Sequence, residues 1–135
     1  MSQFDTNWSF TNEGNLIPKG FCFAGISAGL KTSKKKDLAL ILAPEGSICS
    51  GMFTQSTVRA SCVEICEHRI KRCSGLVRAI LINSGQANAC TGESGTQHFL
   101  EATSKLSDLL GIEAEAVLMC STGVIGVPIP INDLI

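Results

Sequence analysis

A threonine followed directly by a glycine stands just after an apolar run near the end of the chain, in segment 120–124. Thr122 offers a side-chain hydroxyl as a donor, and Gly123 offers a backbone N–H that no side chain obstructs. Two such donors converging on one point can hold the negative oxygen that develops during acyl transfer. A Thr-Gly turn that ends a strand has the same spacing and is common, so these residues alone leave both interpretations open.

A second segment of small and amide residues, 82–92, also follows an apolar run and precedes a helical pattern. Such residues allow close backbone approach at the strand-to-helix edge where α/β proteins commonly bind ligands. The alternative is a hydrogen-bonded turn in which the side chains of Asn83 and Asn88 satisfy backbone groups. This segment is therefore a second candidate for a binding site.

Seven cysteines are scattered along the chain, several within apolar runs where a thiol acts as a small hydrophobe. The pattern indicates a reducing compartment. Residues 62–73 contain three of these cysteines together with His68. Zinc sites usually present tighter cysteine pairs, and core-like apolar residues lie between these ones, so no metal is expected. Cys90 and Cys120 have no recognisable histidine partner and are expected to be packed thiols.

The elements that must position these residues include three continuous apolar runs, 38–43, 77–82 and 116–120. Runs of this kind favour buried strands, so we expect a central sheet, with the first run covered on both faces. Segments 48–53 and 58–67 are expected to be flanking strands, although the second has a short helix as an alternative.

A helix is expected between the second and third apolar runs. Ser94 and Gln97 form a capping-box signature, and Gly111 stands where a glycine would end the helix. One face of this helix is apolar, with Phe99, Ala102, Leu106, Leu109 and Leu110. The order strand, helix, strand predicts an α/β arrangement.

Lysine is concentrated in a short bend, residues 31–36, that follows a glycine-rich apolar stretch. Glycines spaced in this way suit close-packed strands with tight corners better than a helix. The bend is expected to be a solvated hairpin loop, with an anion-binding patch as the alternative.

The composition predicts a single domain over residues 1–135, in which 44% of residues are hydrophobic and 17% charged. So little charge indicates that some apolar surface faces a partner. The formal net charge of -1 does not favour a polyanion, so nucleic acid is not expected as a partner. Residues 1–15 lack the pattern of a signal peptide, and the longest apolar run is too short to cross a bilayer. We expect a soluble cytoplasmic protein.

Five segments, in order, resemble the ornithine acetyltransferase family of arginine biosynthesis. The resemblance extends from about residue 17 to residue 130. Its segments are 18–31, 36–40, 51–58, 83–92 and 121–126. Gln86 stands where the family more often has asparagine, which is a mild departure.

The resemblance implies a precursor that cuts itself into α and β chains, with a threonine at the new β-chain N-terminus as the nucleophile. This threonine uses its own α-amino group as the general base. In that family, the residues equivalent to Thr122 and Gly123 form the oxyanion hole through the hydroxyl and the N–H. The reaction implied moves acetyl from N-acetylornithine to the threonine and then to glutamate. Some members also accept acetyl-CoA, and no bound cofactor is implied.

The fold implied by the resemblance is an α/β architecture with stacked β-sheets flanked by helices, completed by the β chain. Residues 1–135 would then be a partial α chain of a hetero-oligomer. Because Ile135 precedes any Lys-Gly-Ala-Thr cleavage point, the nucleophile and the substrate-binding residues would lie beyond it, and this polypeptide alone is expected to be inactive. Two alternatives remain: a truncated, non-catalytic paralogue acting as a binding or interaction module, and a cysteine-dependent metal or redox protein.

Overall fold

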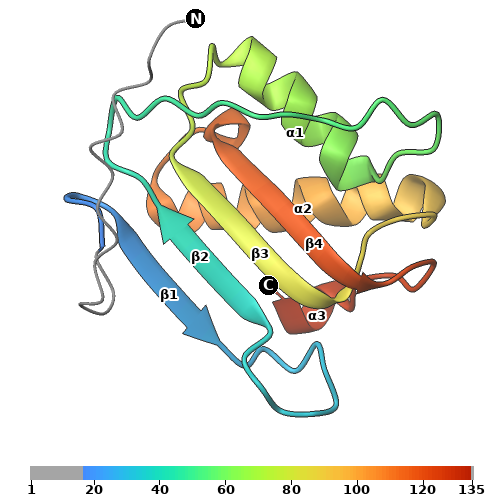
Figure 1. Cartoon of the computed structure of the whole chain (residues 1–135). Helices are drawn as coiled ribbons and strands as arrows, with labels where there is room; N and C mark the ends of the chain where they lie inside the picture. Colours follow the sequence, from blue (N-terminus) through green and yellow to red (C-terminus); the bar gives the residue numbers. More distant parts are fainter. Residues whose placement is uncertain (1–16, 135) are drawn as a thin grey trace, which may run out of the picture.

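The computed structural model describes residues 17–134, whose strands form one mixed sheet in the order β1-β2-β3-β4 (Figure 1). The strands are β1 (Cys22–Ile26), β2 (Leu38–Leu42), β3 (Ala79–Gln86) and β4 (Val117–Val124). β2 pairs antiparallel with both β1 and β3, whereas β3 and β4 run parallel. Each of the three apolar runs forms a strand, so the predicted α/β class is confirmed.

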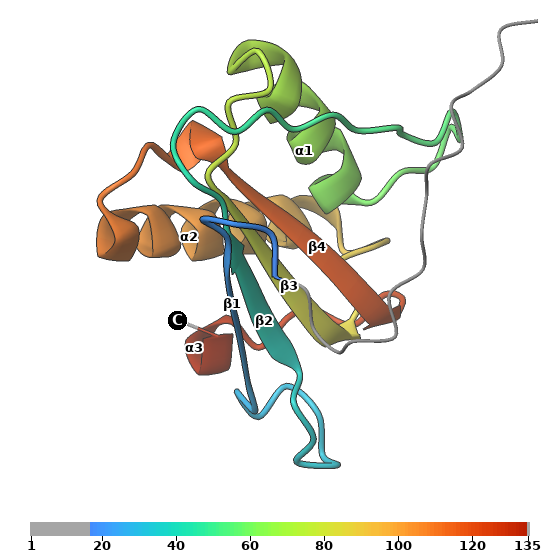
Figure 2. The ribbon, with the colours of Figure 1, turned by 60° about the vertical axis from the view of Figure 1, so that its left-hand side comes forward.

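The helices are α1 (Ser61–Arg72), α2 (Gly92–Leu110) and α3 (Ile131–Leu134), and a short 3-10 helix (Ala114–Ala116) precedes β4. α2 is the crossover that two parallel strands require, as the predicted order of strand, helix and strand implied. Figures 1 and 2 show α2 and α3 against the same face of the sheet, with α1 alongside β4. None of the described helices is long and apolar enough to span a membrane.

The core lies between the parallel strands and the two longer helices. Leu81 of β3 and Met119 of β4 are register partners within it, and Phe99 of α2 has no exposed surface. The guanidinium of Arg69 on α1 lies 4.9 Å from the centre of the Phe99 ring, within the range of a cation–π interaction. Its Nη1 also donates to the carbonyl of Val117 at 2.6 Å. This buried cation therefore joins both helices to β4.

One face of the sheet is not covered by any described helix, which corrects the prediction that the run at 38–43 is covered on both faces. All five residues of β2 are half-buried, because the helices lie against the other face only. Phe23 on β1 and Val124 on β4 are 50% and 59% exposed. The described residues therefore contribute one sheet of the predicted stack and leave one side of it open.

The segment 48–53 does not form the predicted flanking strand. Only Ile48 pairs, with Leu76, in an isolated bridge. The side chain of Ile48 is 71% exposed, whereas Cys49 and Phe53 pack against the core. The segment is therefore held by side-chain packing rather than by a strand ladder.

The segment 58–67 follows the helix alternative rather than the strand interpretation. Cys62, Cys66 and Arg69 are buried on α1 at spacings of four and three residues, which places them on one helical face. Their burial against β4 and α2 stabilises the helix, because isolated helices of this length are marginal in water.

α2 begins at Gly92, two residues before the predicted Ser94. Ser94 therefore lies inside the first turn, where its hydroxyl donates to the carbonyl of Thr91 at 2.7 Å, and the predicted capping box does not form. Gly111 ends the helix in the left-handed conformation, with φ of 63°, as predicted. Leu109 on the predicted apolar face is 74% exposed, because the last turn of α2 stands beside an open cavity.

Candidate functional site

Thr122 and Gly123 lie within β4, which corrects the prediction that they follow the end of a strand. β4 continues to Val124 and stays paired with β3, so that Thr122 lies beside Ser84 and Gly123 beside Gly85. The two segments that the sequence offered as separate candidates are therefore neighbours in one parallel ladder. Any site built on one of them includes the other.

Gly123 occupies a position that has no room for a side chain. Its φ is 135°, and a Cβ added there would lie 2.3 Å from the carbonyl carbon and oxygen of Gly85. Gly85 has φ of 133°, and a Cβ added to it would lie 3.0 Å from the carbonyl oxygen of Leu30. Three backbone segments are thus stacked in close contact, which only glycine allows.

The outer edge of β4 is covered by side chains of α1. Arg69 Nη1 donates to the carbonyl of Val117 at 2.6 Å, and the Cys66 thiol donates to the carbonyl of Met119 at 3.4 Å. In an extended strand, the N–H and C=O of one residue point to the same edge, and successive residues alternate between the edges. The odd-numbered residues of β4 therefore face outward, away from β3.

The same alternation directs the Gly123 amide to the outer edge. At the opposite edge, the even-numbered Val124 accepts a hydrogen bond from Ala87 N–H at 2.9 Å. Cys62, in the first turn of α1, lies against Ser121: burial raises the pKa of its thiol, and hydrogen bonding from Ser121 partly opposes that rise. α1 thus covers the edge of β4 as far as Ser121. The helix begins there and does not extend along the edge to Gly123.

Thr122 is exposed on the open face of the sheet. Its register partner Ser84 is half-buried on the same face, and the Ser84 N–H donates to the carbonyl of Asp37 at 2.8 Å. A row of polar residues therefore runs from Asp37, just before β2, through Ser84 on β3 to Thr122 on β4.

The loop between β1 and β2 is held by the buried carboxylate of Asp37, which is 3% exposed. The carboxylate accepts hydrogen bonds from the backbone N–H groups of Ala28 at 2.7 Å and Lys31 at 2.9 Å. The bond from Ala28 is the main reason that the pKa of Asp37 lies below its ordinary value. The bend at 31–36 is a hairpin loop as predicted, with residues 34–36 exposed.

The two asparagines of the second segment behave as the turn interpretation described. Asn83 Nδ2 donates to the carbonyl of Gln86, and Asn88 Nδ2 donates to the carbonyl of Gly95, both at 3.1 Å. Both side chains are almost fully buried. Within residues 17–134, the Asn83 Oδ1 atom is buried without a hydrogen-bond partner, which is uncommon in a folded protein.

The cysteines divide into buried and exposed groups. Cys62 and Cys66 are packed in the core, and burial raises the pKa of the Cys66 thiol to about 11. The prediction that Cys90 and Cys120 are packed is wrong, since both are exposed. Cys120 stands on the open face, and Cys90 lies in the connection before α2 with φ of 55°. Among the described residues, no group of three or more histidine, cysteine or acidic side chains could hold a metal ion.

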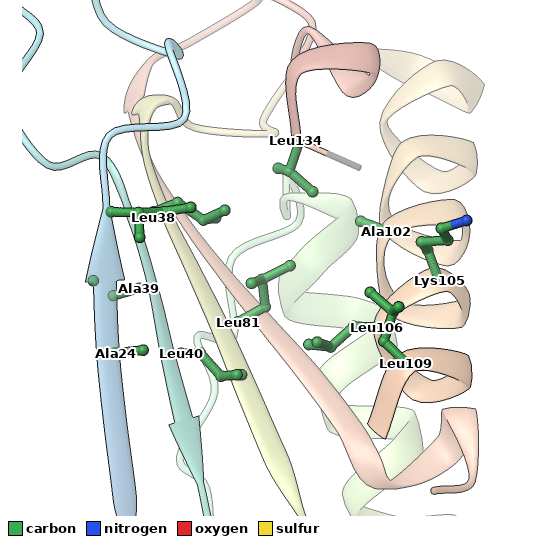
Figure 3. Close-up of a pocket in the computed structure, with 12 residues that line it drawn as sticks. Ala24, Leu38, Ala39, Leu40, Leu81, Ala102, Lys105, Leu106, Leu109 and Leu134 are labelled. Carbon is green, nitrogen blue, oxygen red and sulfur yellow. The ribbon is translucent and has the colours of Figure 1, made fainter. Parts of the chain in front are cut away.

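A cavity of about 220 Å³ opens between α2 and the first two strands (Figure 3). Figure 3 shows aliphatic side chains pointing into it, whereas the amino nitrogen of Lys105 points away. The cavity is lined by Ala24, Gly25, Ile26, Leu38, Ala39, Leu40, Leu81, Ala102, Lys105, Leu106, Leu109 and Leu134. This lining offers no nucleophile or acid–base pair for chemistry, so the candidate site remains at the paired ends of β3 and β4.

The sequence and the fold are both similar to known proteins. A family model described as "ArgJ family" matches residues 22–135. The arginine biosynthesis bifunctional protein ArgJ of Prochlorococcus marinus subsp. pastoris is 73% identical over 124 residues, which cover 92% of this chain and 31% of that protein. Its counterpart in Synechocystis sp. is 48% identical over 123 residues, covering 90% and 30%. The chain thus spans about a third of the length of these curated relatives.

Two solved structures have closely similar folds. The crystal structure of ArgJ from Bacillus halodurans gives a TM-score of 0.81 at 32% identity, covering 86% of this chain and 60% of that one. The ornithine acetyltransferase of Mycobacterium tuberculosis, in complex with ornithine, gives a TM-score of 0.79 at 36% identity, covering 87% and 63%.

Proposed function

The chain belongs to the ArgJ family, and from this premise we propose that it supplies the oxyanion-stabilising pair, Thr122 and Gly123, of an enzyme that transfers acetyl from N-acetylornithine to glutamate. Its relatives are named as bifunctional proteins of arginine biosynthesis. The ornithine complex of the Mycobacterium tuberculosis protein supports an ornithine-type substrate.

The observation that carries the proposal is the position of the Gly123 amide. By the alternation of β4, this N–H faces the outer edge, just past the part of the edge that α1 covers. The hydroxyl of Thr122 stands on the adjoining open face. An oxygen placed beyond the strand edge on the open side is within reach of both donors, as stabilisation of an oxyanion requires.

The start of α1 adds favourable electrostatics. α1 runs antiparallel to β4, so its N-terminus lies toward the Gly123 end of the strand. Its N-cap residue, Ala60, makes no side-chain hydrogen bond to the first turn. The partial positive charge of a helix N-terminus stabilises a nearby negative charge, which here is the developing oxyanion.

In the proposed reaction, a threonine hydroxyl of the β chain attacks the acetyl carbon of N-acetylornithine. The carbonyl oxygen becomes negative and accepts hydrogen bonds from Thr122 and Gly123. The acetyl C–N bond then breaks, and ornithine leaves with the proton that the hydroxyl gives up through the α-amino base. The amine of glutamate attacks the resulting ester, and the threonine regains its proton as N-acetylglutamate forms.

The open face of the sheet supports a partner layer. On this face, at least half of the surface of Phe23 and of Val124 is exposed. Exposed apolar patches of this kind commonly mark an interface. In the proposed enzyme, this face is covered by the β chain that carries the nucleophilic threonine. The resulting αβ assembly is the predicted stack of two sheets.

Thr122→Ala in the full-length protein tests the proposal. Loss of one oxyanion donor typically costs about 3–4 kcal/mol of transition-state stabilisation, so turnover from N-acetylornithine to glutamate is expected to fall roughly 100-fold or more. Thr32→Ala, in the exposed bend before β2, is the matched control and should leave turnover unchanged. Undiminished turnover in Thr122→Ala would remove the assigned role.

A further inference from the structure

Two carboxamide side chains at the end of β3 each donate a hydrogen bond to a backbone carbonyl. Asn83 Nδ2 donates to the carbonyl of Gln86 at 3.1 Å, and Gln86 Nε2 donates to the carbonyl of Leu30 at 2.9 Å. Among the residues that the structure describes, neither Asn83 Oδ1 nor Gln86 Oε1 has a hydrogen-bond partner, although both atoms are buried. An unpaired buried acceptor destabilises a fold, so the contribution of these residues lies in the bonds that their NH₂ groups donate.

The carbonyl of Leu30 belongs to a part of the β1–β2 loop that is fixed in place. The Leu30 side chain is buried. The Asp37 carboxylate holds the loop on both sides of Leu30, because it accepts from Ala28 N–H at 2.7 Å and from Lys31 N–H at 2.9 Å. The bond from Gln86 to Leu30 therefore ties the end of β3 to a buried and internally bonded loop.

The same carbonyl lies against the glycine pair of the candidate site. A Cβ added to Gly85 would lie 3.0 Å from the Leu30 carbonyl oxygen, and one added to Gly123 would lie 2.3 Å from the carbonyl of Gly85. Leu30, Gly85 and Gly123 are thus in contact in that order. Glycine has more backbone freedom than any other residue, and with φ of 133° and 135° neither glycine has the regular strand conformation. The direction of the Gly123 amide therefore depends on what holds Gly85 against it.

We propose that Asn83 and Gln86 are positioning residues for the oxyanion pair, because their NH₂ groups keep Gly85 against Gly123. The bond from Asn83 to the Gln86 carbonyl closes a turn around Gly85. The bond from Gln86 to Leu30 attaches this turn to the loop. In this role neither side chain contacts the substrate. The inference rests on the proposed function, in which the Gly123 amide donates to the oxyanion.

A positioning role has a kinetic signature that a purely structural role lacks. Displacement of the Gly123 amide weakens a contact that forms in the transition state and not in the ground state. Loss of such a contact lowers kcat and leaves KM unchanged, and a misplacement of about 1 Å can cost roughly 100-fold in rate. A purely structural role would instead reduce the amount of folded enzyme without changing the kcat of the folded molecules.

Gln86→Met in the full-length enzyme removes the donor and keeps a side chain of similar length. The kcat for transfer from N-acetylornithine to glutamate is expected to fall about 10- to 100-fold, with the KM for N-acetylornithine unchanged. Thr103→Val on α2 is the matched control, because the buried Thr103 hydroxyl also donates to a carbonyl, that of Phe99, at 2.9 Å. This control should lose stability, measured by urea unfolding, but keep the wild-type kcat.

Amide hydrogen exchange followed by mass spectrometry tests the placement of the glycines without catalysis. Peptides that contain Gly85 or Gly123 should exchange faster in Gln86→Met than in the wild type, and at the wild-type rate in Thr103→Val. Asn83→Asp has the same shape as the wild-type side chain but cannot donate as a carboxylate, so it should raise exchange in the same peptides. Unchanged exchange in folded Gln86→Met, or an unchanged kcat, overturns the inference.

Combining Gln86→Met with Thr122→Ala separates failure of this inference from failure of the proposed function. If both substitutions act on one oxyanion, the combined loss in kcat should be smaller than the product of the single losses, because residues that act as a unit are not additive. Losses that multiply, with Thr122→Ala impaired, overturn the positioning role and leave the proposed function standing. An unimpaired Thr122→Ala refutes the proposed function, whereas faster exchange at Gly123 in Gln86→Met would still support Gln86 as the residue that holds the glycine pair.

Discussion

Replacing Gly123 by alanine is expected to lower the free energy of unfolding of the full-length protein by about 2–5 kcal/mol. An added Cβ would lie 2.3 Å from the carbonyl of Gly85, and forcing such a contact into a packed region costs about 1–3 kcal/mol. The φ of 135° adds about 1–2 kcal/mol for any residue with a side chain. The parallel strands must therefore separate or bend at the site.

The separation should also impair catalysis, because a misplacement of about 1 Å can cost roughly 100-fold in rate. Gly126→Ala is the matched control: Gly126 has φ of 77°, but nothing lies within 4 Å of its added Cβ. This control should carry only the backbone cost, about 1 kcal/mol. Urea unfolding followed by circular dichroism measures both variants, and transfer from N-acetylornithine measures activity. If the two variants unfold at the same urea concentration and remain equally active, close approach of β3 and β4 is not the reason for glycine at this position.

Two further predictions concern buried titratable groups. Asp37→Asn should destabilise the loop at pH 7, because an amide NH₂ group cannot accept from both Ala28 and Lys31 N–H. The pKa of Asp37 is lowered in the folded protein, so its contribution is present above about pH 4 and is lost as the pH falls further. The gap between the urea midpoints of wild type and variant should therefore narrow as the pH falls below about 4, and a constant gap would contradict this. The Cys66 thiol, with its pKa raised to about 11 by burial, should resist iodoacetamide at pH 8 until the protein unfolds, whereas exposed Cys90 is modified in the native state. Mass spectrometry of labelled peptides shows which thiol is modified first. Equal labelling of Cys66 and Cys90 in the folded protein would contradict this prediction.

Apolar continuity predicted the strands because it reflects burial directly. The runs at 38–43, 77–82 and 116–120 each became a strand, and Gly111 ended the crossover helix as expected. The ends of β3 and β4 were missed, since small and polar residues there resemble a turn. They remain extended because two glycines let the parallel backbones approach closely, and this is a property of the pair that neither segment reveals alone.

The exposure of individual side chains was the second property that the local sequence could not predict. Cys120 belongs to an apolar run and was expected to be packed, yet it stands on the face that no described helix covers. Whether a strand residue is buried depends on which layer lies against its face. The same limit applies to Ile48, whose apolar side chain is exposed because no strand or helix packs over it.

The starting point of α1 explains why helix side chains cover only part of the outer edge of β4. Unpaired strand edges invite association with other chains, and α1 covers this one through contacts at Val117, Met119 and Ser121. A further helical turn, about 5.4 Å long, would nearly span the two strand residues, roughly 6.6 Å, that separate Ser121 from Gly123. Because the chain is extended at Ala60, with ψ of 145°, that turn does not form. The edge is thus covered as far as Ser121, and in the proposed site the Gly123 amide beyond it is the donor to the oxyanion.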